Sequence, residues 1–484
     1  MNRGLPGQRG LVVQIESRRF KHYARKALLD SDLQAALANA KGGFVDKRRA
    51  AIESLPEYQA IRDAAREVKE HTLSHLDYYL EKFESSVIAI GGQVHWASTP
   101  SEATRIVTDI CRHSQAKRII KGKSMVGEEI AINPALEAEG LDVIETDLGE
   151  YIIQLANEPP SHIIAPAVHK TRRAITELFY QHHRHLGRHK KVEATADIVN
   201  EAREVLRDAF LSADVGITGA NFLIAETGQN VIVTNEGNGD LCSSLPDVHI
   251  VTASIEKVVP TLEDATLMLR LLARSATGQE MSCYTSFYGG ARQGDDDEAP
   301  REYHVVLLDN GRSTMLSGAF RSMLRCIRCG ACLNHCPVYS AIGGHAYGWV
   351  YPGPMGSVLT PLMQGLEESR DLPNACTLNG RCREVCPMQI NLPDMLRQHR
   401  TRLYLAGSRK WTEKVGLAIW HRLVARPTIY RWCSGFIARS LARLGRRKGF
   451  FRQLPLAGSW TASRFMPAPQ GKTFLQQWKD GDID

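Results

Sequence analysis

The sequence predicts an α/β domain with a largely parallel sheet, followed by a mostly α-helical, cysteine-rich domain and a basic helical segment. Three observations predict this order. Short apolar runs alternate with helical patterns to about residue 311, Cys, Gly and Pro are frequent from there to about residue 398, and Lys and Arg dominate the remainder. Together with a helical start, these changes divide the 484 residues into four expected segments, 1–85, 86–311, 312–398 and 399–484.

Helical periodicity dominates the first segment. After Pro56, a residue suited to the first turn of a helix, apolar side chains recur near a 3.6-residue period. They are Tyr58, Ile61, Ala65, Val68, Leu76 and Leu80. In the second segment, the stretch TPSE at residues 99–102 carries a capping-box pattern, and a further helix is expected near residues 193–211.

Strands of the second segment are predicted where short apolar runs interrupt the helical patterns. The runs lie at 87–92, 118–122, 141–146, 162–168, 222–228, 230–237, 249–254 and 303–308. The pair 222–228 and 230–237 is typical of a hairpin, whereas strands that alternate with helices indicate a parallel sheet. The sequence therefore predicts an α/β domain that ends near Gly311.

The C-terminal segment carries a local excess of positive charge. From Arg397 to Arg452 there are fifteen Lys and Arg residues and one acid, Glu413, a balance of +14 in a chain of net charge +7. The rest of the chain therefore sums to −7, and the excess indicates a local docking surface. Aromatic side chains lie among the arginines, namely Trp411, Trp420, Trp432 and Phe436. A solvated helical face, a peripheral membrane anchor and an interface with acidic partners all fit this pattern, and we favour the partner interface. No nucleic-acid-binding motif accompanies the charge, so we expect no nucleic acid partner.

The N-terminal stretch SRRFKHYARK, residues 17–26, resembles a twin-arginine export signal only in part. The apolar run that such a signal requires is missing, because residues 27–29 lead directly into Asp30 and Ser31. No apolar run is long enough to cross a bilayer. We therefore expect a cytoplasmic protein without transmembrane segments.

Seven of the eleven cysteines lie within 61 residues, from Cys326 to Cys386. The first run, Cys326, Cys329, Cys332 and Cys336 followed by Pro337, has the spacing C-x2-C-x2-C-x3-C-P of bacterial ferredoxins. Three thiolates of such a loop hold corners of one cluster, and the fourth turns to a second cluster. An odd number of clustered cysteines also argues against disulfides. The remaining four are expected to be buried small apolar residues, namely Cys111, Cys242, Cys283 and Cys433.

The second run, Cys376-x5-Cys382-x3-Cys386-Pro387, repeats the end of the first run. Crossed ligation therefore predicts a 4Fe–4S cluster on Cys326, Cys329, Cys332 and Cys386. A second cluster is left with three thiolates, from Cys336, Cys376 and Cys382, and Asn379 stands where a fourth belongs. Because an amide is a poor ligand for iron in a sulfide cage, two outcomes remain open, a 3Fe–4S cluster and a 4Fe–4S cluster whose last iron is held by water, Asn379 or a partner. Zinc fits the seven thiols badly.

The cysteine spacing resembles that of the iron–sulfur subunits of succinate dehydrogenase and fumarate reductase, in which a substitution at the corresponding position leaves a 3Fe–4S centre. The upstream residues do not resemble the plant-type ferredoxin domain of those subunits. They resemble the LUD (lactate utilisation) family instead. The stretches that carry this resemblance are 121–170, 216–238, 343–361 and 466–474.

The LUD resemblance extends over almost the whole chain. It implies a CoA-transferase-like fold for the α/β domain and a ferredoxin-type domain with two 4Fe–4S clusters. It also implies an iron–sulfur component of a three-subunit bacterial system that oxidises L-lactate to pyruvate in the cytoplasm. The implied partners are a subunit with cysteine-rich cluster-binding repeats and a LUD subunit without clusters.

The α/β domain offers few motifs for chemistry of its own. The stretch KGKS at residues 121–124 is not a P-loop, because Lys117 stands where the first glycine is required, and no G-x-G-x-x-G fingerprint for a flavin or nicotinamide is present. Lys121, Lys123, His169 and Lys170 are candidates to bind a carboxylate or to act as a base. We therefore expect the clusters to be the redox groups of this chain.

Two further features are ambiguous. Glu226 lies between two apolar runs and is either a solvated turn residue or a functional carboxylate. The insert GGHAYGWVYPGPMGSV at residues 343–358 is expected to pack beside the clusters, and docking of an electron acceptor at His345 or Tyr351 is the alternative.

The leading interpretation is an electron-transfer subunit of a lactate-oxidising complex. The first alternative is a LUD-domain catalytic or ligand-binding subunit whose clusters are largely structural. The second is the same role with another 2-hydroxy acid such as glycolate, because the sequence does not select the substrate.

Overall fold

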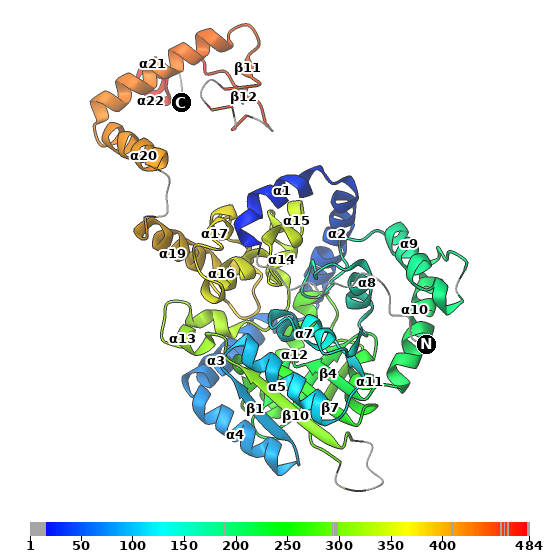
Figure 1. Ribbon diagram of the computed structural model, residues 1–484. Coiled ribbons are helices and arrows are strands. Elements are labelled where there is room, and N and C mark those ends of the chain that lie inside the picture. Colours follow the sequence, from blue (N-terminus) through cyan, green and yellow to red (C-terminus); the bar gives the residue numbers. More distant parts are fainter. Residues whose placement is uncertain are drawn as a thin grey trace. The chain divides into compact units, whose positions relative to one another are not determined.

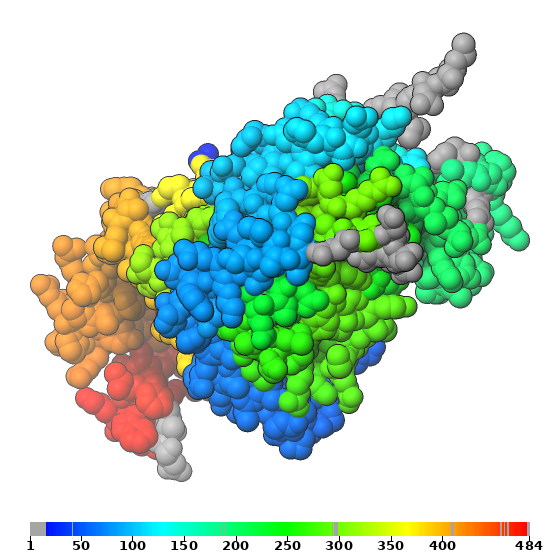
Figure 2. Space-filling model, turned by 90° about the horizontal axis from the view of Figure 1, so that it is seen from below, coloured from blue at the N-terminus to red at the C-terminus, as the bar shows by residue number. Residues whose placement is uncertain are grey.

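The computed structural model describes residues 16–187, 189–292, 294, 299–407, 411–454, 457–458, 460–461 and 464–481. The chain forms two compact units, residues 1–403 and 404–484. In the space-filling view the N-terminal helices (blue) and the α/β residues (cyan to green) of the first unit form one continuous surface (Figure 2).

A six-stranded parallel sheet forms the centre of the α/β part of the first unit (Figure 1). In spatial order its strands are β1 (Gln93–Ala97), β10 (Glu302–Leu308), β7 (Val248–Ser254), β4 (Val215–Gly219), β2 (Arg118–Lys121) and β3 (Asp142–Glu145). Every pair runs parallel. The central strands are apolar and buried on both faces, as a sheet covered by helices requires. Their carboxyl ends therefore meet at one edge, where α/β folds hold ligands.

Helices cover both faces of this sheet. On one face Val107 and Cys111 of α5 (Pro100–His113) pack against Ile119, Val215 and Ile250. On the other, α4 (Leu76–Ala89) places Phe83 and Val87 in a separate core with residues of β7 and β10. The predicted start of α5 is confirmed, because the Thr99 side chain accepts a hydrogen bond from the Glu102 N–H at 3.3 Å and Pro100 occupies the first turn.

The remaining helices of the α/β part connect or flank the strands. They are α6 (Met125–Glu129), α7 (Ile132–Ala138), α8 (Leu148–Ala156), α9 (Arg172–His182), α10 (Thr195–Leu211), α11 (Asn238–Ser244) and α12 (Leu262–Ala276). A second sheet contains β8 (Val258–Val259), β5 (Phe222–Ile224), β6 (Asn230–Thr234) and β9 (Tyr284–Tyr288). Its antiparallel β5–β6 pair confirms the predicted hairpin.

Two predicted strands are wrong. Residues 87–92 end helix α4, because Val87 continues the row of buried residues at helical spacing and Gly91, at φ 82°, ends the helix. Residues 162–168 form turns in place of a strand. There Nδ1 of His162 accepts hydrogen bonds from the Ile164 and Ala165 N–H groups, at 3.0 and 3.2 Å, so these donors are unavailable to a neighbouring strand.

The cysteine-rich part is built from short helices and three helices from the N-terminus. The N-terminal helices are α1 (Phe20–Leu29), α2 (Ser31–Glu53) and α3 (Tyr58–Ser74). The others are α13 (Arg312–Leu316), α14 (Ala331–Asn334), α15 (Tyr339–Ile342), α16 (Gly353–Met363), α17 (Asp371–Ala375), α18 (Arg381–Glu384) and α19 (Leu392–Leu405). Arg48 and Arg62 donate hydrogen bonds to the carbonyls of Val385 and Cys386, at 2.8 and 2.7 Å. The first helices thus hold the second cysteine run from outside its own segment.

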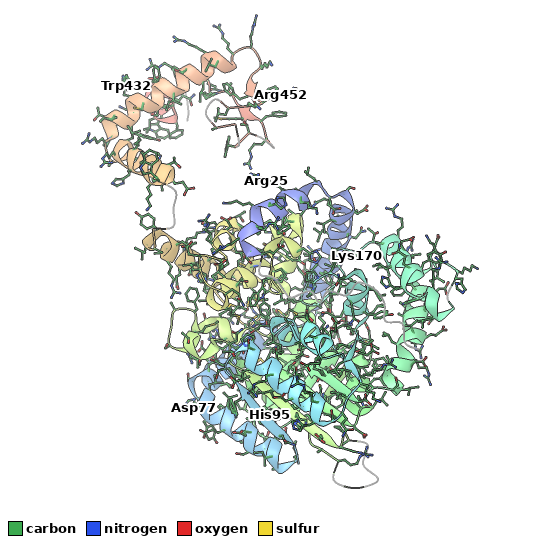
Figure 3. The ribbon with its side chains drawn as sticks, viewed as in Figure 1. Arg25, Asp77, His95, Lys170, Trp432 and Arg452 are labelled. Carbon is green, nitrogen blue, oxygen red and sulfur yellow. The ribbon has the colours of Figure 1, made fainter. Side chains whose placement is uncertain are left out.

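The C-terminal unit contains α20 (Trp411–Val424), α21 (Pro427–Gly445), α22 (Phe474–Asp480) and the short strands β11 (Phe450–Phe451) and β12 (Met466–Pro467). No residue of α20 is buried. Trp420 and Trp432 are 62% and 68% exposed, and Trp432 lies on α21 (Figure 3). Among the described residues no helix combines the length and hydropathy needed to cross a bilayer.

A close approach between helix α11 and strand β4 makes one glycine sensitive to substitution. A Cβ at Gly216 would lie 1.8 Å from the carbonyl oxygen of Cys242. We therefore expect Gly216→Ala to destabilise the first unit by about 3 kcal/mol, the upper end of the usual cost of overpacking. The midpoint of thermal unfolding measures the effect.

Gly42, in the middle of α2, is the matched control for Gly216. A Cβ at Gly42 has no atom within 4 Å, so Gly42→Ala should stabilise the helix by about 0.5–1 kcal/mol. Equal unfolding midpoints for the two variants would contradict the packing described for β4.

Candidate functional site

The two cysteine runs have the same backbone conformation. In the first, Arg328 and Gly330 have φ values of 58° and 74°, and helix α14 begins after Gly330. In the second, Leu378 and Gly380 have φ values of 57° and 84°, and α18 begins after Gly380. The equivalence places Asn379 in the second loop where Cys329 stands in the first. The second loop therefore keeps the conformation of a cluster-binding loop although it lacks one thiol.

The seven thiols line two separate hollows. Residues of the first hollow include Cys326, Cys329, Cys332 and Cys386. Residues of the second include Cys336, Cys376, Cys382 and Asn379. The last cysteine of each run thus lies with the thiols of the other run, which is the grouping that crossed ligation requires.

The electrostatics of these thiols fit iron–sulfur clusters. Burial, with a contribution from Cys386, raises the pKa of Cys329 to about 12, and burial beside Cys376 raises that of Cys382 to about 12. Thiols gathered in this way ionise readily only when a metal compensates the charge. Backbone N–H groups point to the sulfurs, with Leu378 N 3.3 Å from Cys376 Sγ and Ile390 N 3.4 Å from Cys386 Sγ. Such hydrogen bonds are a usual means of tuning cluster potentials.

The two hollows differ in their access to solvent. Each hollow contains buried thiols, Cys329 and Cys386 in the first and Cys382 in the second, but only the second has an exposed side chain, that of Asn379, at a ligand position. The Asn379 side-chain oxygen accepts a hydrogen bond from the Arg381 N–H at 3.2 Å. Water or a partner can therefore reach the position of the missing thiolate.

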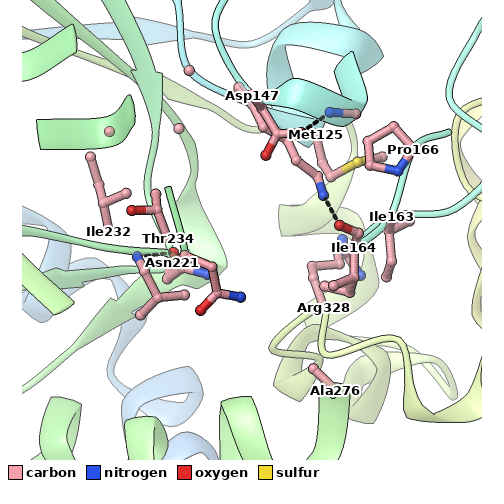
Figure 4. Close-up of a pocket in the computed structure, with 18 of the residues that line it drawn as sticks. Met125, Asp147, Ile163, Ile164, Pro166, Asn221, Ile232, Thr234, Ala276 and Arg328 are labelled. Atoms are coloured by element: carbon pink, nitrogen blue, oxygen red, sulfur yellow. Dashed lines mark hydrogen bonds between the residues drawn. The ribbon is translucent and has the colours of Figure 1, made fainter. Parts of the chain in front are cut away.

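A cavity of about 530 Å³ lies at the carboxyl ends of the parallel strands. It opens where the chain leaves β2 toward β3 and leaves β4 toward the second sheet, a topological switch point. Residues that follow β2 and β4, Gly122 and Ala220, line it. Figure 4 shows Asn221 and Ile232 on one wall and Ile163 and Arg328 on the opposite wall.

The cavity adjoins the first cluster hollow. Ile163 and Arg328 line both spaces, and Tyr351 of the cysteine-rich part also lines the cavity. Its ionisable lining includes three cations, Lys123, Lys257 and Arg328, and two acids, Asp147 and Glu236. Burial lowers the pKa of Lys257 to about 8. A polar cavity and a thiol cage therefore share one wall.

Of the four candidates for substrate binding, the structure brings only Lys123 to the cavity, where it donates a hydrogen bond to the carbonyl of Ile164. Lys121 is buried away from it and pairs with Glu128 and Glu145 at 3.0 and 2.8 Å. His169 and Lys170 both bind Glu158, at 2.7 and 2.5 Å. Three of the four thus have structural partners.

The structure also shows the surroundings of Glu226, His345 and Tyr351, whose roles the sequence leaves ambiguous. Glu226 is exposed in the β5–β6 turn and accepts a hydrogen bond from the Leu262 N–H at 3.3 Å, which agrees with a solvated turn residue. The His345 ring makes a 2.7 Å hydrogen bond with the Pro159 carbonyl. Tyr351 is buried and donates to Glu129 at 2.6 Å, so it packs inside the protein.

The cysteines outside the two runs are not all buried. Cys111 and Cys242 are buried, as predicted, and Cys433 is partly exposed. The prediction is wrong for Cys283, which is exposed immediately before β9. Two residues that line the cavity, Lys257 and Arg328, were not among the candidates predicted from the sequence. A charged residue between two ligating cysteines is the one local signal that points to Arg328.

Comparison with known proteins identifies the α/β part and the cysteine-rich part of the first unit. Residues 80–308 match the LUD domain family, and residues 322–390 match the 4Fe-4S dicluster domain family. Lactate utilization protein B of Geobacillus thermodenitrificans is 40% identical over 472 residues, which cover 97% of this chain and 98% of that protein. The chain belongs to the lactate utilization protein B family. Other members, from Oceanobacillus iheyensis and Exiguobacterium, are also 40% identical, over 97% and 95% of this chain and 98% and 97% of their own lengths. The dicluster match indicates iron–sulfur clusters.

Substitution of Cys386 tests the crossing of the two runs. Cys386→Ala removes a thiol of the second run from the first hollow, so we expect it to abolish the cluster built on Cys326, Cys329 and Cys332. Iron and acid-labile sulfide of the anaerobically reconstituted protein should fall by about half. The control is Cys283→Ala, whose exposed thiol lines neither hollow. An intact first cluster in Cys386→Ala would mean that the runs do not cross.

Substitution of Asn379 tests the role of the missing thiolate. Asn379→Cys restores the four-cysteine pattern on a backbone that already matches the first loop. We expect the EPR signal of an oxidised 3Fe–4S centre to be lost and a complete 4Fe–4S cluster to be retained after exposure to air, with a gain of about one iron per chain. Asn374→Cys on α17 lies outside the second hollow and should change neither quantity. An unchanged EPR spectrum of Asn379→Cys would place the fourth ligand elsewhere.

Proposed function

We propose that this protein is the iron–sulfur electron-transfer subunit of a multi-subunit system that oxidises L-lactate to pyruvate. The observation that carries the proposal is the grouping of seven thiols from two runs into two cages. Cys326, Cys329, Cys332 and Cys386 would hold a 4Fe–4S cluster. Cys336, Cys376 and Cys382 would hold a 3Fe–4S cluster, or a 4Fe–4S cluster with a non-cysteine fourth ligand.

The chemistry of the reaction supports this role. Oxidation of a 2-hydroxy acid to a 2-oxo acid releases two electrons and two protons, and a bound iron–sulfur cluster supplies one-electron transfer. The enclosed first cage adjoins the cavity, and the second opens to solvent at Asn379, so the two cages lead from the interior toward the surface. The relatives of about 40% identity are named for lactate utilisation.

The proposed partners are a subunit with cysteine-rich cluster-binding repeats and a LUD subunit without clusters. The C-terminal unit supports docking of an acidic partner, because α20 and α21 expose aromatic and apolar side chains among arginines. We retain the segments 1–85, 86–311, 312–398 and 399–484 as the proposed domains. A cytoplasmic location is part of the proposal, since clustered thiols persist in a reducing compartment.

The cavity also favours a second candidate, a LUD-domain ligand-binding or catalytic subunit whose clusters are largely structural. The same fold could also serve glycolate. The midpoint potentials of the clusters separate the two roles, because electron transfer requires at least one cluster between the potentials of the substrate couple and of the acceptor.

We expect the purified chain alone not to oxidise L-lactate with an artificial acceptor, because its described residues show no group suited to two-electron chemistry. Addition of the two partner subunits should give turnover and reduction of the clusters, followed by EPR. Turnover by the single chain would overturn this assignment, and unreduced clusters during turnover by the complex would favour the second candidate.

Charge reversal on the C-terminal unit tests the docking surface within the same experiment. Arg422→Glu, Arg431→Glu and Arg443→Glu combined should weaken complex formation by at least about tenfold and leave the EPR spectrum of the free chain unchanged. The control combines Arg105→Glu and Arg207→Glu, which lie exposed on the first unit. Wild-type binding by the triple variant, or its loss in the control, would contradict the proposed surface.

A further inference from the structure

Lys257 is a buried cation that the described residues leave without a direct partner, although Glu256 and Cys326 are close enough to interact with its charge. It follows β7, is 8% exposed and lines the cavity, and its ammonium makes no hydrogen bond or ion pair with the described residues. A buried charge without compensation costs several kcal/mol, so proteins seldom keep one. Its position in a cavity wall indicates a ligand that supplies the negative charge.

Arg328 provides a second unused donor in the same wall. It is 9% exposed, its guanidinium lies 5.0 Å from the centre of the Tyr351 ring, and Nη2 lies 3.3 Å from Glu256 Oε1. Its Nη1 is buried and has no hydrogen-bond partner in the described structure. The left-handed backbone of Arg328, at φ 58°, is unfavourable for a residue other than glycine. The first cysteine loop therefore adopts a strained conformation at the residue that reaches the cavity.

Nearby carboxylates do not balance these cations. Glu256 is shared, because Arg312 Nε also lies 2.8 Å from its Oε2, and Arg312 pairs with Glu129 at 2.8 Å. The buried charged groups of this region are Lys69, Lys257, Arg312, Arg328, Glu129 and Glu256. Positive charges thus exceed the carboxylates by two, before the thiolates of the first cage are counted. A single carboxylate ligand would reduce this excess and satisfy the free donors.

We propose that Lys257 and Arg328 bind the carboxylate of a short 2-hydroxy or 2-oxo monocarboxylic acid in this cavity, against the wall shared with the first cage. The inference rests on the proposed function and specifies where its substrate class binds. Apolar residues of the same cavity, Ile163, Leu272 and Ala276, suit a small aliphatic side chain. The cavity is larger than such an acid fills, which leaves space for a group from a partner.

The acids of the lining set the expected selectivity. The Asp147 carboxylate holds the start of α8, with its Oδ1 3.1 Å from the Gly149 N–H, and Glu236 accepts from the Leu148 N–H at 2.9 Å. Figure 4 places Asp147 and Arg328 at separate positions around the cavity. A ligand with a second negative group would meet these carboxylates, so monocarboxylates should bind better than dicarboxylates.

The cations have one competing role, because positive charge beside a cluster offsets the negative charge of its thiolates and raises its potential. In that role they act without any ligand. Binding of a carboxylate and the effect of that binding on the first cluster distinguish the two roles.

The test uses the full-length chain with reconstituted clusters under anaerobic conditions. Isothermal titration with L-lactate, with oxamate as an inert analogue of the 2-oxo acid, and with L-malate gives affinities. EPR-monitored titration with and without oxamate gives the midpoint potential of the first cluster. We expect oxamate and L-lactate to bind, L-malate to bind at least about tenfold more weakly, and bound oxamate to lower the potential, because it adds negative charge.

Lys257→Met is the decisive variant. It removes an uncompensated buried charge at nearly constant volume, so its unfolding midpoint should be unchanged or higher, while oxamate affinity falls at least about tenfold and the oxamate-dependent change in potential disappears. Arg328→Gln should lose affinity for oxamate to a similar extent. If that substitution disturbs the cysteine loop, the result for Lys257→Met alone decides the test. Lys170→Met, which loses an ion pair outside the cavity, should bind oxamate within about twofold of wild type.

Three results would overturn the inference. The first is that the wild type binds neither oxamate nor L-lactate measurably. The second is that Lys257→Met binds oxamate with the affinity of the wild type. The third is that Lys257→Met lowers the potential of the first cluster while oxamate has no effect on that potential in the wild type. Failure of the proposed function gives a different pattern, because oxamate would bind as expected while the clusters of the complete complex remained unreduced by lactate.

Discussion

The exchange of cysteines between two loops is the constraint on which the arrangement of the first unit depends. Cys336 ends the first run and lies with the second group of thiols, and Cys386 ends the second run and lies with the first. Each cage needs both loops in place, because each takes one or more of its thiols from the other run. Arg48 and Arg62 fix the end of the second run through its carbonyls. Helices about 300 residues earlier in the chain are therefore part of the cluster-binding structure.

The same constraint explains why the cavity adjoins the thiols. The residue before Cys329 must adopt a left-handed conformation for the loop to turn, and in this chain that residue is an arginine whose side chain reaches the carboxyl edge of the sheet. A parallel sheet with a crevice at its switch point and a cysteine loop thus share Arg328 and Ile163. A ligand in the cavity would lie beside the loop that encloses the first cage.

The sequence was sufficient for the parts of the structure that depend on local spacing. Thiol spacing is set by the geometry of one short loop, and the apolar runs of β2, β3, β7 and β10 are bounded by residues that end strands. The predicted strand at residues 87–92 is wrong because four consecutive apolar residues fit the end of a helix as well as a strand. The predicted strand at residues 162–168 is wrong because the His162 side chain binds backbone N–H groups that a strand would need. Lys257 could not be predicted, because a lysine without a partner is recognised only once its tertiary surroundings are known.

The difference between the two cages gives the proposed transfer a direction. Burial disfavours the more negatively charged, reduced form of a cluster, so it would lower the potential of a cluster at the first site, an effect that Arg328 and Lys257 would partly offset. The second site lacks one thiolate and is exposed at Asn379, and both features favour its reduced form. Within the proposed function, the site nearer the cavity is therefore the weaker electron acceptor and the site at the surface the stronger one. The second loop keeps the backbone conformation of the first even without its thiol, and it thereby holds Cys376 and Cys382 in place while leaving the remaining position open to water or to a partner.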